Sequence, residues 1–294
     1  MRGSEFIAAN AGKSLAQWEA AAIALAALDP AGGGIVPWPM IPIEVEIRGW
    51  SDDLKNRPPM APPIKHRGRY FVTSDYFAIG IPPSAGQAGD YVRMPLTPGA
   101  AQSVANTKGM FLPTAKMVDD IWRVSTRLVP QPLIPNKGAN LFQYAEHSRL
   151  IDAQLASPDW DPGLTSPLRS GHKKDVILSN IWKPGKVVIY GWHRPDGTFI
   201  QPKSNIHGDF YVDYSHGIRL VSPNMEVDGK SIAVEDVLKS SELAPLLSSE
   251  GPLRRVRYPA LPLSAGQAGG TNPARVSYFD LGFSTLIALG RRAA

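Results

Sequence analysis

The sequence predicts an α+β fold in which helices from the first half of the chain cover a largely antiparallel sheet from the second half. Two observations carry this prediction. Apolar residues recur at helical spacing up to about residue 156, whereas short β-branched and aromatic segments separated by turns follow from about residue 175. No domain boundary is visible between the two parts, so residues 7–294 are expected to form a single globular domain.

The helices are predicted from capping residues that precede apolar, periodic segments. Ser14, Thr97 and Thr114 can each accept a hydrogen bond from a backbone N–H of the first helical turn, and Pro98 fits the first helical position. Pro158 ends the segment before it, because proline cannot continue a helix. The predicted helices span residues 15–28, 98–106, 115–128 and 140–156, with a last helical segment at 234–247.

The strands are predicted from alternation and from β-branched or aromatic content. Residues 41–48 alternate apolar and charged side chains over their second half, which is the period of a half-buried strand. Residues 194–197, Arg-Pro-Asp-Gly, have the residue types of a tight turn between two strands. The other predicted strands are one or two within 69–81, then 175–181, 186–193, 198–200, 209–214, 218–221 and, near the C-terminus, 276–289.

Residues 1–6, Met-Arg-Gly-Ser-Glu-Phe, resemble an expression-vector leader, because common cloning sites encode Gly-Ser and Glu-Phe. We therefore leave these six residues out of the predicted domain. A signal peptide trimmed at that junction is compatible with the export that we expect below.

The composition excludes several classes of protein. With no cysteine, the chain has no disulfide, no thiolate metal site and no cysteine nucleophile. The net charge of +5 comes without a basic cluster, so nucleic acid is not expected as a partner, whereas weak attraction to anionic polymers is compatible with it. No apolar run reaches the roughly 18 residues of a transmembrane helix, so no transmembrane segment is expected.

Residues that can carry chemistry concentrate between His193 and Arg219. Five of the six histidines lie between His147 and His216, and several aspartates accompany them. Ionisable groups that converge in one region are typical of functional sites. The candidate catalytic residues are His193, His207, Asp213, Ser215 and His216, and the candidate substrate-binding residues are His172, Lys173, Trp192, Tyr214 and Arg219.

The stretch 206–220 resembles the active-site signature of the L,D-transpeptidases. A His-Gly pair at His207 is followed by Ser-His-Gly at 215–217 and by an arginine at Arg219. The resemblance implies a histidine that activates a nucleophile and an arginine that orients the donor stem of peptidoglycan. The family's nucleophilic cysteine has no counterpart, since Ile218 follows the glycine directly, so transpeptidase chemistry is not carried over as such.

Three other hypotheses fit the same residues. Ser215 can be a nucleophile with a histidine as base and Asp213 or Asp175 as the orienting acid, although the chain has no Gly-x-Ser-x-Gly motif. The histidines and their tyrosine and tryptophan neighbours can instead form a polar-aromatic sheet surface without a catalytic role. Imidazoles and a carboxylate can also bind zinc or a related ion, and that site would use His172, His193, His207, His216 and Asp213.

The sequence favours an exported bacterial hydrolase or acyl-transfer enzyme, secreted or periplasmic, that acts on a polymeric or peptide substrate of the cell envelope or on another extracellular polymer. The block at 190–193, Tyr-Gly-Trp-His, also resembles blocks of secreted bacterial proteins of uncharacterised function, which implies export. The alternatives are a non-catalytic carbohydrate- or peptidoglycan-binding protein and a histidine-ligated metalloenzyme. No cofactor and no oligomeric state follow from the sequence.

In the favoured hypothesis the histidine-rich stretch forms one catalytic group. His216 or His207 would be the general base, and Asp213 would fix its tautomer. Arg219 would hold a substrate carboxylate, and Ser215 or a water molecule would attack. This mechanism requires these side chains to gather around one concavity.

Overall fold

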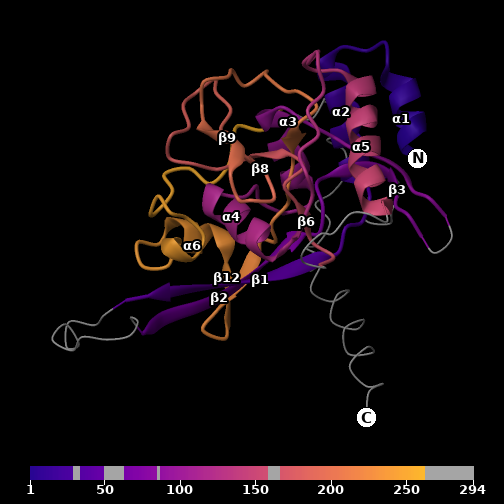
Figure 1. The fold of residues 1–294 in the computed structure, drawn as a ribbon. Helices are drawn as coiled ribbons and strands as arrows, with labels where there is room; N and C mark the ends of the chain where they lie inside the picture. The colour runs from indigo at the N-terminus through magenta and orange to yellow at the C-terminus, as the bar shows by residue number, and fades with distance from the viewer. Residues whose placement is uncertain (29–33, 50–62, 85–86, 158–165, 262–294) are drawn as a thin grey trace. The chain divides into compact units, whose positions relative to one another are not determined.

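The computed structural model describes residues 1–28, 34–49, 63–84, 87–157 and 166–261 (Figure 1). Met1–Leu261 forms one compact unit, and its helices and antiparallel sheets confirm the predicted α+β class. The helices are α1 (Gly3–Asn10), α2 (Leu15–Leu28), α3 (Pro98–Thr107), α4 (Ala115–Val124), α5 (Leu141–Ala156) and α6 (Val234–Lys239), with a 3₁₀ turn at Ala244–Leu246. The strands are β1 (Met40–Arg48), β2 (Ile64–Thr73), β3 (Ala78–Ile81), β4 (Asp90–Arg93), β5 (Thr126–Arg127), β6 (Arg169–Ser170), β7 (Lys174–Val176), β8 (Ile189–His193), β9 (Phe199–Ser204), β10 (His216–Gly217), β11 (Asn224–Val227) and β12 (Lys230–Ala233).

The helices begin close to the residues that the sequence predicts. Thr114 and Asn140 each accept a hydrogen bond from a backbone N–H of the first turn, at 3.2 and 3.1 Å, and so cap α4 and α5. The predicted end of α4 at Leu128 is wrong, because the chain turns extended after Val124 and forms β5, which pairs with β6. The last predicted helix is likewise shorter, since α6 ends at Lys239.

Most strands belong to one of two four-stranded sheets. The first has the order β1-β2-β11-β12 and is antiparallel throughout, so it combines strands from both halves of the chain. The second has the order β10-β7-β8-β9, in which β7, β8 and β9 are antiparallel and the short β10 runs parallel to β7. The prediction of a sheet formed by the second half alone is therefore incomplete.

The predicted strand at 209–214 is wrong. These residues form a turn and an extended loop, in which the Asp213 carboxylate accepts a hydrogen bond from the backbone N–H of Ser215 at 2.9 Å. A side chain that bonds its own backbone two residues on replaces a strand ladder with a turn. The segment 218–221 contributes two isolated bridges at Val221, to Val72 and to Phe111, instead of a strand. The predicted strand at 276–289 lies outside the described residues.

Helix α4 lies between the two sheets and contacts β1 on one side and β8 on the other (Figure 1). Its Met117 and Ile121 belong to the main hydrophobic core. Val118 packs with Ile177 and Val188, which flank β7 and β8, in a second small apolar cluster. The helix therefore covers one face of the second sheet, and it is on this face that the candidate site lies.

Residues 3–6, which the sequence analysis sets aside as a leader, are part of α1. Phe6 is buried in the core, and the Ser4 hydroxyl donates a 2.6 Å hydrogen bond to Asp90 at the start of β4. The backbone of Gly3 lies against Tyr91 so closely that a Cβ would be 2.7 Å from its Cα. These residues therefore take part in the packing of the described unit.

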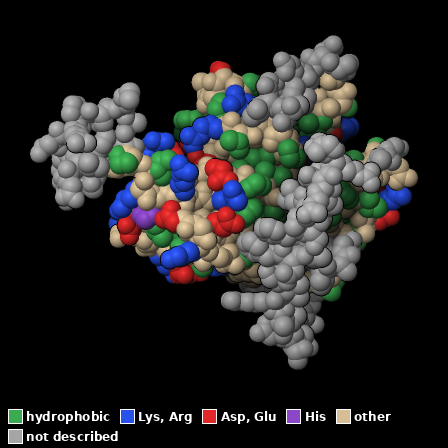
Figure 2. Space-filling model, turned by 90° about the horizontal axis from the view of Figure 1, so that it is seen from below, with side chains coloured by type: hydrophobic (Ala, Val, Ile, Leu, Met, Phe, Trp, Pro, Cys, Tyr) green, Lys and Arg blue, Asp and Glu red, His purple; other side chains and the backbone are tan. Residues whose placement is uncertain are grey.

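The outer face of the first sheet carries charges of both signs. Arg69 on β2 bonds Glu44 on β1 at 2.5 Å and Glu226 on β11 at 3.3 Å. Figure 2, which views the molecule from below, shows acidic and basic side chains mingled on this face. Among the described helices, none is long and apolar enough to cross a membrane.

Candidate functional site

The register of β7 divides the predicted site residues between the two faces of the second sheet. Lys174 and Asp175 are neighbours on β7, so their side chains point to opposite faces. His216 on β10 lies opposite Lys174, and Gly217 lies opposite Asp175. The predicted residues therefore form two groups, and the single concavity required by the favoured hypothesis is not present.

The first group surrounds the carboxylate of Asp213, which is buried. Its Oδ2 accepts hydrogen bonds from Lys174 Nζ at 3.0 Å, Tyr211 OH at 2.7 Å and Asn136 Nδ2 at 3.1 Å. Burial acts to raise the pKa of Asp213, but the hydrogen bond and charge of His216 and the charge of Lys174 hold it well below its ordinary value. These contacts favour the ionised form of Asp213, and its Oδ2 already accepts three hydrogen bonds.

The other oxygen of Asp213 holds both Ser215 and His216. The Ser215 hydroxyl donates to Oδ1 at 2.6 Å, and His216 Nδ1 lies 3.2 Å from the same atom. A serine nucleophile needs a base that accepts its proton, yet this hydroxyl is buried and bonds a carboxylate that is a weak base, because its pKa lies well below the ordinary value. Burial lowers the pKa of His216 to about 4, so its imidazole is neutral near pH 7.

His207 joins this group only through Tyr211. Its ring stacks on the tyrosine ring with centroids 3.9 Å apart and planes 10° apart. Burial, followed by the charge of Lys174, lowers the pKa of His207. His207 makes no hydrogen bond with Asp213 or His216 in the described structure, so the two predicted bases do not form a pair.

The second group lies on the opposite face, around the buried carboxyl group of Asp175. The Tyr76 hydroxyl donates to Asp175 Oδ2 at 2.8 Å, whereas Oδ1 is buried and has no hydrogen-bond partner among the described residues. Burial raises the pKa of Asp175 to about 6. A carboxyl group in this state can exchange a proton near neutral pH.

Arg219 is fully buried beside Tyr76, with its guanidinium carbon 4.1 Å from the centre of the tyrosine ring. Its Nη1 donates to the backbone oxygen of Thr73 at 2.8 Å and its Nη2 to that of Arg169 at 2.6 Å. Nε has no partner among the described residues. Two of the five guanidinium N–H groups are therefore used by backbone oxygens, and the side chain is held in place beside the second group.

His193 lies on the Asp175 face because of a local change in the backbone of β8. Trp192 has a φ of 56°, a left-handed conformation that bulky residues rarely adopt, and the pairing of β8 with β9 shifts its register between Ile189 and Gly191. The His193 ring contacts Tyr190, with centroids 5.6 Å apart, and its Nε2 lies 3.3 Å from Asp119 Oδ1 on α4. Asp119 therefore orients the imidazole from the partly exposed end of the site.

A hollow lies between α4 and the second sheet, where these groups meet. Its empty volume is about 220 Å³ with open solvent included, and the space within it holds about one water molecule. Trp122 on α4, partly exposed and stacked against Arg127 at 4.0 Å, forms one wall. The hollow is lined by Tyr76, Val118, Ile121, Trp122, Ser170, Gly171, Lys173, Asp175, His193 and Arg219.

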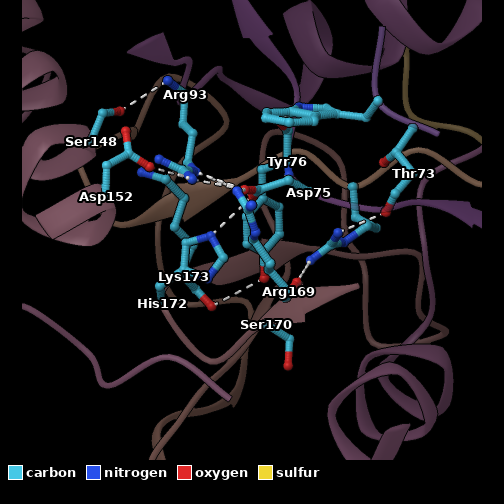
Figure 3. Close-up of polar contacts among 12 residues, drawn as sticks. Thr73, Asp75, Tyr76, Arg93, Ser148, Asp152, Arg169, Ser170, His172 and Lys173 are labelled. Carbon is cyan, nitrogen blue, oxygen red and sulfur yellow. Dashed lines mark hydrogen bonds and ion pairs between the residues drawn. The ribbon is translucent and has the colours of Figure 1, made fainter. Parts of the chain in front are cut away.

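A buried ionic network that no sequence pattern predicted adjoins this hollow (Figure 3). Asp75 accepts hydrogen bonds from Arg93 Nη2 at 2.8 Å and from His172 Nε2 at 3.1 Å. Arg93 also pairs with Asp152 at 2.9 Å. Arg93 comes from β4 and Asp152 from α5, whereas Asp75 and His172 lie in the bends that follow β2 and β6, so the network joins β4 and α5 to these two bends (Figure 3).

Lys173 lies next to this network. Its Nζ donates to the backbone oxygen of Tyr214 at 2.6 Å and lies 3.2 Å from His147 Nδ1. Burial, with the charge of Arg93, lowers the pKa of Lys173 to about 7, and burial lowers the pKa of His172 to about 4. His172 and Lys173, predicted to bind substrate, thus join buried elements and present no group to solvent.

The two predicted aromatic contacts, Trp192 and Tyr214, are buried as well. Their rings pack on each other with centroids 6.3 Å apart, and the Tyr214 hydroxyl accepts a hydrogen bond from the backbone of Leu133 at 2.8 Å. Neither offers a flat face to a ligand. The metal hypothesis also lacks its geometry, because in the described part of the chain no three histidine, aspartate or glutamate side chains come together as a ligand set.

Tyr76 and Asp119 are not among the predicted site residues. Tyr76 follows β2 in a segment without any motif, and it reaches Asp175 from 99 positions away. One hypothesis makes Asp175 the orienting acid of Ser215, whereas the structure holds the Ser215 hydroxyl at Asp213, on the other face of the sheet. A scan against protein-family models and searches of curated proteins and of solved structures found no match to this chain.

Proposed function

We propose that this protein is an enzyme that catalyses hydrolysis or acyl transfer, and that the hollow around Asp175 is its reaction centre. The observation that carries the proposal is the unpartnered Oδ1 of Asp175, a buried carboxyl oxygen on the wall of a water-sized hollow that His193 also lines. A buried acceptor without a partner is costly, so such an atom is typical of a site that meets a ligand or a reacting water.

The proposed reaction uses water as the nucleophile, because the Ser215 hydroxyl is held on the other face of the sheet. Asp175 Oδ1 accepts a proton from water while the water oxygen bonds to the acyl carbon. The leaving atom takes a proton from His193 as its bond to that carbon breaks, and Asp119 orients the imidazole from its other side. In acyl transfer, a hydroxyl or amine acceptor replaces the water.

The proposed substrate is a polymer of the bacterial cell envelope or a peptide derived from it, and the proposal includes export of the protein. The substrate class rests on the resemblance of residues 206–220 to the L,D-transpeptidase signature, and export rests also on the resemblance of residues 190–193 to blocks of secreted bacterial proteins. Trp122, which lines the hollow, is partly exposed, and Asp119, the partner of His193, is about half exposed. A scissile carbonyl group can approach Asp175 from this side.

Incubation with purified peptidoglycan tests the proposal, with soluble fragments quantified by chromatography. Asp175→Asn and His193→Ala are each expected to lower fragment release about 100-fold or more, since they remove a proton-transfer group. The matched controls are Asp196→Asn in the exposed turn 194–197 and His66→Ala on β2. They make the same chemical changes away from the hollow and should leave the rate of fragment release unchanged. Folded Asp175→Asn protein with the wild-type rate would refute this reaction centre.

A second candidate function is non-catalytic binding of a cell-envelope glycan. One observation favours it: Ile206 and Phe210 are 72% and 80% exposed beside the stacked rings of His207 and Tyr211. Exposed apolar and aromatic side chains beside polar groups are typical of binding surfaces. Sedimentation with peptidoglycan that releases no fragments, and that is lost in Phe210→Ala, would favour this candidate over the enzyme.

A further inference from the structure

A second hollow, which shares no residue with the first, is formed by the segment after β7 and by residues 255–258. Its empty volume is about 180 Å³ with open solvent included, the space within it holds about one water molecule, and its lining is mostly apolar. Trp182 forms one wall, and the Arg255 guanidinium carbon lies 4.6 Å from the centre of a Trp182 ring. The hollow is lined by Leu178, Ser179, Trp182, Arg255, Arg257 and Tyr258.

The two arginines of this hollow have no acidic partner. In the described part of the chain, no carboxylate forms an ion pair with Arg255 or Arg257. Arg257 packs on Phe111 at 4.0 Å, and its Nη1 donates only to neutral oxygens, Asn106 Oδ1 at 2.9 Å and Met110 O at 3.2 Å. Burial lowers the pKa of Arg257, opposed only by the more distant charge of Glu235. A half-buried cation without a counter-ion is unfavourable, and a bound anion would offset that cost.

The other polar groups that line this hollow offer a free hydrogen-bond donor and few free acceptors. The Ser179 hydroxyl is bonded to Glu250 at 2.8 Å, and the Tyr258 hydroxyl donates to the backbone oxygen of Ile177 at 2.7 Å. The indole Nε1 of Trp182, in contrast, is buried and has no partner among the described residues. An N–H group has no acceptor function, so the hollow is complementary to a ligand rich in acceptor atoms.

We propose that this second hollow is a binding site for an oxyanion, the carboxylate or phosphate group of a ligand. The fork-shaped guanidinium groups of Arg255 and Arg257 bind two oxygens of such a group, and the Trp182 N–H supplies a third hydrogen bond. The proposal depends on neither Asp175 nor His193 and is therefore independent of the proposed reaction.

Nuclear magnetic resonance of the tryptophan indole N–H groups tests the site directly. The Trp182 signal is assigned by its loss in Trp182→Phe. Inorganic phosphate and acetate are titrated separately at an ionic strength held constant with sodium chloride. A saturable shift of the Trp182 signal is expected with at least one of them, and the anion that binds identifies the class of ligand group.

Arg255→Ala is the principal variant, because this side chain is exposed and its loss leaves the core intact. It is expected to weaken anion binding about tenfold or more, because it removes a hydrogen bond between a charged donor and the anion. Arg257→Lys keeps the charge but loses the fork, and should weaken binding too. Arg149→Ala, which removes an exposed arginine paired with Glu146 on α5, is the matched control and should bind as wild type.

Two results would overturn the proposal. One is the absence of a saturable Trp182 shift with either anion in the wild-type protein. The other is an unchanged affinity in folded Arg255→Ala protein. Because Asp175→Asn should bind the anion as wild type does, a failure here is distinguishable from a failure of the proposed reaction.

Discussion

The ring of Tyr76 lies directly against the backbone of Gly217, where a Cβ atom would be 2.5 Å from the tyrosine Cε1. This contact brings the tyrosine hydroxyl across β10 to Asp175 on β7, with which it forms a 2.8 Å hydrogen bond. The glycine of the Ser-His-Gly stretch thus has a steric reason, since any larger residue would displace the group that positions Asp175.

Gly217→Ala should destabilise the protein by roughly 1–3 kcal/mol, because an extra methyl group in a filled interior forces its neighbours apart. Urea unfolding measures the loss. In the background of Tyr76→Leu, which lacks the aromatic ring, the same substitution should cost less, and the difference is the coupling energy of the pair. Equal costs in both backgrounds would contradict the contact.

Asp175 is expected to make stability depend on pH. Its pKa is raised by burial from 3.8 to about 6, so the folded state binds the proton more tightly than the unfolded state. Stability from this group is complete below about pH 4 and is lost as the pH rises to about 6. Asp175→Asn should lack this slope and be more stable at pH 7, by on the order of 3 kcal/mol. Chemical denaturation at pH 4.5 and 7 measures both effects, and parallel curves for the two proteins would disprove the raised pKa.

Glu19 on α2 gives a second pH-dependent contribution. Its carboxyl group accepts hydrogen bonds from the backbone N–H of Thr97 at 2.6 Å and from its hydroxyl at 3.0 Å, at the start of α3. Burial raises the pKa of Glu19 from 4.5 to about 7, so stability should fall as the pH rises between these values.

Glu19→Gln keeps an acceptor for Thr97 and should remove only the pH slope. Glu19→Ala leaves the buried N–H unpaired and should lower stability at every pH, by about 1–3 kcal/mol. Melting temperatures of the three proteins between pH 4.5 and 8 distinguish the two effects. A slope that persists in Glu19→Gln would assign it to another group.

Ser215→Ala tests whether the reaction takes place on the Asp175 face or on the Asp213 face of the second sheet. The hydroxyl donates to Asp213 Oδ1, so its removal should lower stability by about 1 kcal/mol. Fragment release from peptidoglycan should remain within about twofold of wild type, because the proposed reaction takes place on the Asp175 face. If folded Ser215→Ala protein lost its activity while Asp175→Asn retained it, the reaction centre would lie at Asp213 instead.

Local features of the fold were predictable where neighbouring residues decide the conformation. Helix α2 spans residues 15–28 as predicted, and the turn at 194–197 joins β8 to β9. The segment 209–214 was not predictable in the same way, because its aromatic, strand-like pattern is overridden by the hydrogen bonds of Asp213 with side chains from other segments.

The candidate site was predictable only in part. Lys173, His193 and Arg219 were identified as functional candidates and do line the first hollow. Their partners were not, since Tyr76 and Asp119 come from segments without motifs. Conversely, Ser215 and His216 carry the recognisable pattern, yet both are held by Asp213 on the other face.

The sequence by itself determined the α+β class, the starts of the capped helices and the absence of thiol chemistry, because propensity, capping and composition act over a few residues. Only the tertiary structure decided which ionisable groups meet. A one-residue step along β7 changes the face of the sheet, and Tyr76 and Asp175 are joined across 99 positions. Packing, rather than proximity along the chain, therefore selects which residues can act together.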